Sequence, residues 1–196
     1  METSKKILIV LGHPNSKTSL CSYLAQCYYA EAKESGFEVN LLVLSDLKFE
    51  PNLYVSYKEK QFMEPDLILS QNLIRESDHL VFIFPSWWSS MPALLKAWLD
   101  RVWLPGFAFQ YQKKSPFPLK LLKGKSARII ITMDAPNWYY RIWNGAPGLK
   151  LLKIGTLNFC GISKVRTTIF GEVRTSTQAK REGFANKVKS LAKSGI

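Results

Sequence analysis

Short aliphatic runs alternate with stretches of helical periodicity along the whole chain. The aliphatic runs are typical of strands buried on both faces, and they predict strands at residues 6–11, 37–44, 79–84, 127–132 and 164–170. Apolar positions three or four apart, after capping residues, predict helices at 19–35, 66–76, 92–103, 149–159 and 177–193. The remaining stretches, 50–64, 105–123 and 134–147, are polar, aromatic or rich in proline, and are expected to be surface excursions and loops.

This order of elements predicts an α/β fold. A crossover helix between two aliphatic strands makes those strands parallel members of one sheet, with helices on both faces. The expected architecture is a three-layer sandwich with a five-stranded parallel sheet, and the lack of a repeat or linker predicts that residues 1–196 form a single domain. Ligands of such sheets bind outside the carboxyl ends of the strands. Chemistry is therefore expected just after residues 11, 84 and 132.

Composition narrows the class of protein without indicating a function. The 196 residues are 46% apolar and 21% charged, which is typical of a globular chain. No apolar run approaches the ~20 residues of a membrane helix, and the run at 7–11 is too short for a signal peptide. Three cysteines without a C-x-x-C pair and two scattered histidines argue against a disulfide framework and a zinc cluster. These features predict a soluble, cytoplasmic protein without a metal site.

The charge is strongly uneven along the chain. The net charge is +12, and residues 113–196 hold 17 Lys and Arg against 3 Asp and Glu. A basic half indicates a polyanionic partner, such as nucleic acid, anionic lipid or a phosphorylated small molecule. A solvated basic surface without a partner explains the same composition equally well.

The loop after the first predicted strand is dense in hydrogen-bond donors. Its candidate binding residues are His13, Ser16, Lys17, Thr18, Ser19 and Leu20. The free amides and positive dipole of a helix N-terminus favour a phosphate at this point, and the hydroxyls and lysine add donors. An ordinary helix cap after a polar turn is the alternative. The density of donors favours the phosphate site.

Two further strand-end loops are aromatic. The segment after the third strand holds Pro85, Ser86, Trp87, Trp88 and Ser89, which either wrap a flat ligand or plug the core or a subunit contact. The segment after the fourth strand holds Thr132, Met133, Asp134 and Ala135 and then the catalytic candidates Tyr139 and Tyr140. Either phenol could act near a reacting atom or serve only in packing. One loop suited to phosphate and two suited to a planar ring favour a flavin mononucleotide over nucleic acid.

The chain resembles the flavodoxin-fold NAD(P)H:quinone oxidoreductases, the group of DT-diaphorase and its shorter bacterial relatives. Residues 84–102 are similar to the family pattern F-P-x-x-W-x-x-x-P-A-x-L-K-x-W-x-D/E-R-V, and residues 7–13 and 159–161 also match. The resemblance implies a flavodoxin-like fold with strand order 2-1-3-4-5 and a tightly bound flavin. It implies ping-pong hydride transfer from NADH or NADPH through the flavin to a quinone or similar small-molecule acceptor. It also implies a homodimer with its sites at the subunit interface.

The resemblance assigns roles to the strand-end residues. His13, Thr18, Ser19 and Leu20 fall where the family holds the flavin phosphate, and residues 85–89 fall where it contacts the ring. The family's Thr-Thr-Gly-Gly loop at the pyrimidine edge is Thr-Met-Asp-Ala at 132–135, and Asp134 is expected to point away from that edge. No histidine follows the tyrosines, so Tyr139 or Tyr140 would act alone. The shorter carboxyl end favours FMN over FAD.

Two other functions fit parts of the pattern. A flavin-binding electron carrier or a regulatory subunit, of the kind that assists potassium-efflux systems, would have the same fold without turnover of its own. The basic charge argues against the carrier, because flavodoxin carriers are typically acidic. A nucleic-acid-binding protein that has lost its flavin is disfavoured, because the sequence holds no nucleic-acid motif.

Overall fold

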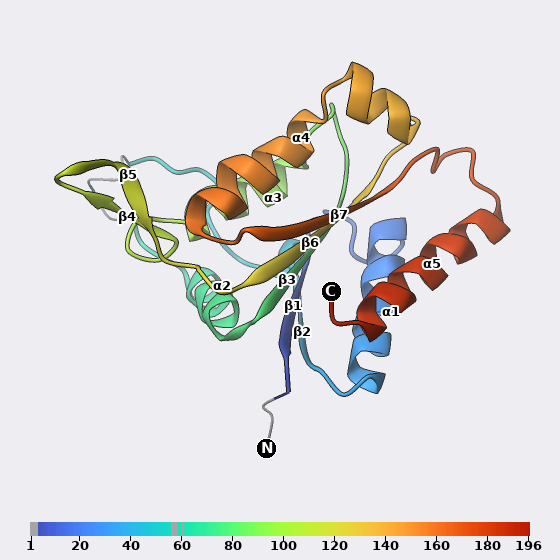
Figure 1. The fold of residues 1–196 in the computed structure, drawn as a ribbon, viewed down its shortest axis with the longest axis horizontal. Helices are drawn as coiled ribbons and strands as arrows, with labels where there is room; N and C mark the ends of the chain where they lie inside the picture. The colour runs from blue at the N-terminus through green and yellow to red at the C-terminus, as the bar shows by residue number, and fades with distance from the viewer. Residues whose placement is uncertain (1–3, 56–58, 60) are drawn as a thin grey trace.

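A parallel sheet forms the centre of the computed structural model, which describes residues 4–55, 59 and 61–196. Among these residues the sheet has five strands in the order β2-β1-β3-β6-β7 (Figure 1). Their bounds are Lys6–Leu11 (β1), Glu38–Val43 (β2), His79–Pro85 (β3), Ser126–Thr132 (β6) and Lys164–Phe170 (β7). Counted among the sheet strands alone, this is the predicted order 2-1-3-4-5, and the flavodoxin-like α/β fold is confirmed.

Helices cover both faces of the sheet. On one face lie α1 (Leu20–Glu34) and α5 (Gln178–Lys193), which pack against each other (Figure 1). On the other face lie α2 (Pro65–Glu76), α3 (Ala93–Val102), α4 (Pro147–Lys150) and η3 (Leu151–Asn158). Side chains of a strand alternate between the two faces, so β1 sends Ile7, Ile9 and Leu11 to the α1–α5 core and Leu8 and Val10 to the opposite core.

Local sequence signals explain where the long helices begin and end. The Ser19 side chain accepts a hydrogen bond from the Ser22 amide and caps α1, and Thr177 caps α5 in the same way through the Lys180 amide. Gly36 follows α1 with a φ of +85°, a conformation that ends a helix at little cost only for glycine. The side-chain caps therefore define the first residues of α1 and α5, and Gly36 marks the end of α1.

Two parts of the chain differ from the sequence-based expectation. Residues 105–123 were expected to be an irregular excursion, but they contain an antiparallel hairpin of β4 (Phe109–Gln112) and β5 (Ser115–Lys120). Residues 134–147 were expected to be a loop, but they include the short π-helix η2 (Tyr139–Trp143). The helix predicted at 149–159 exists, but most of it is the wider π-helix η3. Periodicity alone does not distinguish a π-helix from an α-helix over so short a stretch.

A buried arginine, Arg101, anchors the segment at residues 50–64, which was predicted to be a surface excursion. The structure describes this segment apart from residues 56–58 and 60. The Arg101 side chain is 1% exposed and forms an ion pair of 2.8 Å with Glu64. It also donates to the backbone carbonyls of Glu50 and Phe62. The 3₁₀ turn η1 (Leu44–Asp46) follows β2 and precedes this segment. Within the described residues, no helix combines the length and the apolar character needed to cross a membrane.

Candidate functional site

A cleft of about 250 Å³ opens at the carboxyl ends of β1, β3 and β6. It brings together nine of the residues predicted to bind a cofactor: His13, Ser19, Leu20, Pro85, Ser86, Trp87, Thr132, Met133 and Asp134. It also includes two residues that the sequence did not single out, Cys21 and Val173. The other predicted residues stand back from its walls: Ser16, Lys17, Thr18, Trp88, Ser89, Ala135, Tyr139 and Tyr140.

The first wall is the loop between β1 and α1, and Asn15 organises it. The Asn15 side-chain oxygen accepts the amides of Lys17 and Thr18 at 3.1 and 3.2 Å, and its nitrogen donates to the Thr18 hydroxyl at 2.9 Å. The amides of Leu20 and Cys21 belong to the first turn of α1, so the helix itself offers them no acceptor. Because both residues line the cleft, these amides and the helix dipole make this wall suited to an anion.

His13 joins the first wall to the second. Its Nδ1 accepts the Asn15 amide at 2.9 Å, which leaves the proton of the neutral ring on Nε2. Burial lowers the pKa of His13 and outweighs the opposing effect of the contact with Asn15, so the ring is neutral at pH 7. Its edge meets the Trp87 indole with the ring centroids 5.6 Å apart and the planes at 72°. The histidine therefore contributes a neutral donor and a support for the indole.

The second wall is a tight turn after β3. The amides and carbonyls of Trp87 and Ser90 form hydrogen bonds of 3.0 and 2.9 Å with each other. The residues between them, Trp88 and Ser89, have φ values of 51° and 59°. These left-handed values cost a residue other than glycine of the order of 1 kcal/mol. The turn directs Trp87 to the cleft and leaves Trp88 fully exposed at 100%.

The strained turn is held from behind by the segment 140–149. The Gly148 amide donates to the Ser89 carbonyl at 2.9 Å, and a Cβ on Gly148 would lie 2.6 Å from the Ser90 Cα. Only glycine allows this close approach. The buried Tyr140 phenol accepts the Leu149 amide at 3.1 Å and lies 3.5 Å from the Ser89 carbonyl, and burial raises its pKa. Tyr140 thus supports the turn from outside the cleft.

Tyr139 has a different environment from its neighbour. Its side chain is 42% exposed, and its ring meets the edge of Trp138 with the centroids 6.0 Å apart. Trp138 is itself 62% exposed, so both rings lie at the surface of the segment that follows β6. Neither predicted catalytic tyrosine reaches the cleft wall, and a role for either phenol in the reaction stays a prediction.

The third wall continues from β6. The Thr132 carbonyl accepts the Ser86 amide at 2.7 Å, which joins this wall to the turn after β3. The Met133 amide donates a hydrogen bond to the Phe170 carbonyl at the end of β7. The Met133 carbonyl accepts one from the Val173 amide, in the loop after β7. One Asp134 carboxylate oxygen accepts the Arg174 amide at 2.9 Å. The carboxylate is thus engaged by the loop after β7, although the residue lines the cleft.

Cys21 forms the floor beside the third wall. Its thiol lies 3.2 Å from the Thr132 hydroxyl, and its residue is 1% exposed. Burial raises its pKa to about 12, so the thiol remains protonated and is a poor nucleophile. Its position in the first turn of α1, two residues after the cap Ser19, was the available signal. Val173 comes from the loop after β7, and the adjacency of β6 and β7 was the signal for it.

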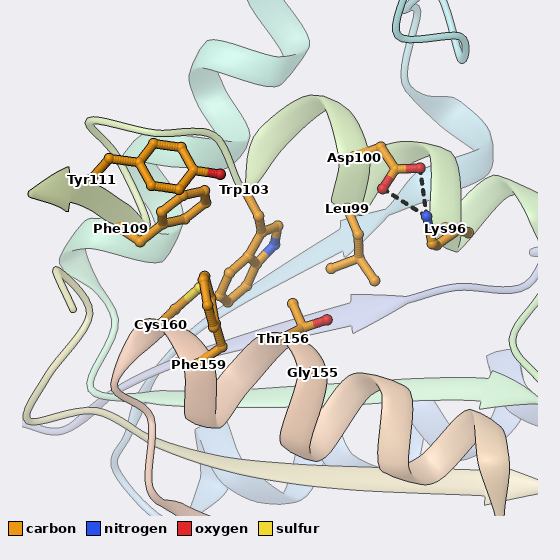
Figure 2. A pocket seen from close by; sticks show the side chains of 10 residues that line it. All are labelled: Lys96, Leu99, Asp100, Trp103, Phe109, Tyr111, Gly155, Thr156, Phe159 and Cys160. Carbon is orange, nitrogen blue, oxygen red and sulfur yellow. Dashed lines mark hydrogen bonds and ion pairs between the residues drawn. The ribbon is translucent and has the colours of Figure 1, made fainter. Parts of the chain in front are cut away.

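A second cavity of about 250 Å³ lies away from the strand ends, between α3, β4 and η3. Figure 2 shows its aromatic walls, which are formed by Trp103, Phe109, Tyr111 and Phe159. At one side Lys96 holds both carboxylate oxygens of Asp100 at 2.7 Å. None of the predicted site residues lines it.

The strand-end cleft combines an anion-binding helix N-terminus, an indole wall and an edge of backbone groups. This arrangement at the carboxyl ends of the strands of an α/β protein is suited to a phosphate-bearing planar ligand. The chain belongs to the family described as flavodoxin-like fold, whose model matches residues 5–193. The family expected from the sequence is therefore confirmed.

Comparison with known proteins gives relatives along almost the whole chain. An uncharacterized NAD(P)H oxidoreductase of Haemophilus influenzae is 31% identical over 183 residues, covering 90% of this chain and 89% of the relative. NAD(P)H dehydrogenase [quinone] 1 of Cavia porcellus is 28% identical over 221 residues, covering 97% and 78%.

Solved structures show the same fold. The crystal structure of Smu.1420 from Streptococcus mutans has a TM-score of 0.79 at 31% identity and covers 96% of this chain and 99% of its own. An FMN-dependent NADH-azoreductase of Bacillus anthracis, solved in complex with FMN, has a TM-score of 0.73 at 16% identity and covers 96% and 97%. At that identity, the second comparison shows the fold alone.

Proposed function

We propose that this protein is a flavin-dependent NAD(P)H oxidoreductase that passes hydride from NAD(P)H, through a bound flavin, to a quinone or similar small-molecule acceptor. The observation that carries the proposal is the cleft in which an anion-binding helix end, an indole wall and a backbone edge meet at three adjacent strand ends. The names of the two relatives, an NAD(P)H oxidoreductase and a quinone dehydrogenase, support the same reaction.

The residues of the cleft fit a flavin. The amides of Leu20 and Cys21 and the capping Ser19 would hold the phosphate, and Trp87 would flank the ring. The backbone at Met133 and Asp134 would meet the polar edge of the ring, where donors stabilise developing negative charge. We favour FMN over FAD, and the FMN complex of the azoreductase with the same fold supports that choice.

A bound flavin would supply the hydride chemistry, and the protein would supply position and electrostatics. The hydrogen bond from the Arg174 amide holds the Asp134 carboxylate and reduces repulsion of a developing anion. The neutral His13 adds no charge that would have to be compensated. The tight turn at 87–90 fixes the indole, so the ring and the nicotinamide would meet in one geometry.

A homodimer with its sites at the subunit interface belongs to the same proposal. Large apolar side chains at the cleft end of the molecule are exposed: Trp88 at 100%, Ile142 at 77% and Trp143 at 78%. Exposed apolar groups of this size are typical of an interaction surface. The hydrogen bond between Gly148 and Ser89 holds their two segments together, so one partner surface would cover both.

The visible spectrum of the purified protein tests the function. Flavin bands near ~370 and ~450 nm that bleach when NADPH or NADH is added without air would support the proposal. Release of the flavin would then identify FMN or FAD. A flavin that stays oxidised would instead favour an electron carrier or a regulatory subunit. A colourless protein that takes up no added FMN would refute the flavin site itself.

A pair of cap variants tests the phosphate position. Ser19→Ala and Thr177→Ala each remove a side-chain cap, and each should cost about 1 kcal/mol of stability. Only Ser19 lines the cleft, so Ser19→Ala alone should also weaken FMN binding, by about fivefold for a lost hydrogen bond of about 1 kcal/mol. Equal FMN affinity in the two variants would argue against phosphate at the end of α1.

A further inference from the structure

Four basic side chains gather near the amino ends of the sheet strands, at the opposite end of the sheet from the strand-end cleft. They are Lys5, which directly precedes β1, and His79, Arg128 and Arg166 in β3, β6 and β7. In each of these strands, the residue two or four positions further on packs in the α1–α5 core. Alternate residues of a strand share a face, so all four basic side chains lie on the side of the sheet that α1 and α5 cover (Figure 1).

The strand register places these side chains next to one another. Arg128 is the direct partner of Arg166 across β6 and β7, and His79 pairs with Ser126, two residues before Arg128. On the other side of His79, β1 pairs with β3, which brings Lys5 near the histidine. Burial lowers the pKa of His79 to about 3, and the charges of the other three basic groups add to that effect. Like charges opposite each other in a sheet repel, so this region is strongly positive even with His79 neutral.

Three buried polar atoms of this region have no hydrogen-bond partner among the described residues. They are Nε of Arg128, Nε2 of His79 and the hydroxyl of Tyr28 on α1, in residues that are 4%, 1% and 0% exposed. Arg128 donates from Nη1 to the Thr168 hydroxyl at 2.8 Å, and Nδ1 of His79 lies 2.7 Å from the Ser126 hydroxyl. Burial raises the pKa of Tyr28 and the charge of Arg128 opposes this rise, so the phenol is protonated and lies near the guanidinium. Buried polar groups are almost always paired, so the three atoms together point to a ligand.

The positive charge at this place also needs a counter-ion. Within the described part of the chain, no ion pair includes Arg128 or Arg166. Burial lowers the pKa of Lys5 and of Lys125, and the Asp78 carboxylate opposes that effect at both lysines. A water molecule would accept hydrogen bonds but would leave the charge of the buried guanidinium uncompensated, which is strongly unfavourable. An anion meets both requirements.

We propose that this cluster binds a small inorganic oxyanion, of the class of phosphate and sulfate, between the sheet and α1. Arg128 Nε, His79 Nε2 and the Tyr28 hydroxyl would donate to its oxygens, and the two guanidinium groups would balance its charge. In the edge strand β7, Arg166 is exposed and Thr168 is half-buried, so the ion can enter along that edge. Because the three donors belong to residues at most 4% exposed, the site suits a free ion rather than the phosphate of a nucleic acid or a lipid.

Calorimetric titration with sodium sulfate tests the site, with sodium chloride at equal ionic strength as the reference. The wild type should bind sulfate saturably. Arg128→Met keeps the apolar stem but removes the guanidinium, and it should bind sulfate at least about tenfold more weakly, as expected for the loss of a hydrogen bond to a charged group. Lys189→Met removes an exposed charge from α5 and should bind sulfate as the wild type does. Equal affinity of Arg128→Met and the wild type, or no saturable binding at all, would overturn the proposal.

The strand-end cleft is the competing location, because the amino end of α1 also suits an anion. The titration is therefore repeated with FMN at saturation and with Ser19→Ala, and sulfate binding should be unchanged in both. Sulfate binding that FMN or Ser19→Ala abolishes, and that Arg128→Met retains, would place the ion in the cleft and overturn the proposal. A failure of FMN to bind would refute the flavin site and leave this test intact. Glycerol phosphate should not displace the sulfate, and displacement as strong as that by inorganic phosphate would overturn the assignment to a free ion.

The histidine rings provide a measurement that needs no variant. His79 keeps a pKa of about 3 without the ion, whereas an oxyanion at Nε2 favours the charged ring. In a nuclear magnetic resonance titration, saturating sulfate should therefore raise the proton affinity of His79 at least about tenfold. His13, in the cleft, should titrate as it does in chloride. An unchanged titration of His79, on protein that has bound sulfate, would show that the ion lies elsewhere and would overturn the proposal.

Discussion

The contact of Gly148 with the strained turn gives the sharpest prediction of this structure. A Cβ at this position would lie 2.6 Å from the Ser90 Cα and 2.8 Å from the Ser89 carbonyl oxygen. Both atoms belong to the backbone, so no side-chain rotation relieves the overlap. In Gly148→Ala the turn must therefore retreat by about 0.8 Å to reach the ordinary contact distance of 3.4 Å.

This displacement has a stability cost and a larger functional cost. Overpacking against backbone costs about 1–3 kcal/mol, and the better helix propensity of alanine in the single turn of α4 recovers at most about 1 kcal/mol. The net loss lies between about 0 and 3 kcal/mol, and its middle range of about 1–2 kcal/mol lowers the melting temperature of a chain of this length by about 2–8 °C. A misplacement of about 1 Å at a catalytic wall reduces turnover by up to about 100-fold.

A second glycine provides the control for this experiment. Gly155 lies in η3, where a Cβ would meet nothing within 4 Å. Gly155→Ala should keep the wild-type flavin affinity and NAD(P)H-dependent bleaching, and its melting temperature should be equal to or slightly above that of the wild type because alanine favours a helix. Gly148→Ala should lose in all three. The reasoning is refuted if Gly148→Ala melts and binds flavin as the wild type does.

Three other outcomes follow from buried groups. Burial lowers the pKa of His79 from 6.5 to about 3, and the positive charges of Lys5, Arg128 and Arg166 add to this effect. Because the histidine is neutral in the folded protein and becomes charged when the chain unfolds, unfolding takes up a proton below pH 6.5. Stability should therefore fall by about 2 kcal/mol from pH 7 to pH 5 in urea titrations, and His79→Gln should lose that component. Glu64→Gln leaves the Arg101 charge without its partner and should cost about 3 kcal/mol. Burial raises the pKa of Glu64, but hydrogen bonds and Arg101 together lower it further, so the net shift is downward. The wild type should therefore lose the stabilisation by this ion pair below about pH 4.5, whereas Glu64→Gln should show no such loss. The three buried cysteines should resist a thiol reagent in the native protein and all react in urea, and fast native labelling would contradict their burial.

The sheet could be predicted from the sequence because its three inner strands, β1, β3 and β6, are short runs of mostly apolar residues between turn signals. The edge strands β2 and β7 mix polar residues with Val, Leu and Ile, and their places between helical segments indicate them. The hairpin of β4 and β5 was missed for a physical reason. Pro116 and Pro118 lie inside β5, and proline normally argues against a strand because it cannot donate to a neighbour. A two-stranded hairpin tolerates both prolines, because only one edge of each strand is paired.

The candidate site could be predicted to the level of loops but not of side chains. The rule that ligands bind at strand ends gave all three walls of the cleft. It did not distinguish Trp87, which lines the cleft, from Trp88, which faces solvent. That difference depends on the left-handed conformation of Trp88 and Ser89. It also depends on the close contact of Gly148 with Ser90, which lies 58 residues earlier in the chain. Contacts over such a separation leave no local pattern in the sequence.

The order of the strands also has a consequence for synthesis of the chain. The inner edge of β1 is covered by β3, whose first residue is made only after residues 12–78. At ordinary rates of translation these residues take roughly 3–13 s. During that interval the run Ile7 to Leu11 has at most one neighbour, β2, and its other edge is an apolar template for aggregation. The nascent chain is therefore most exposed to aggregation before β3 emerges, when β1 has only one of its two neighbours.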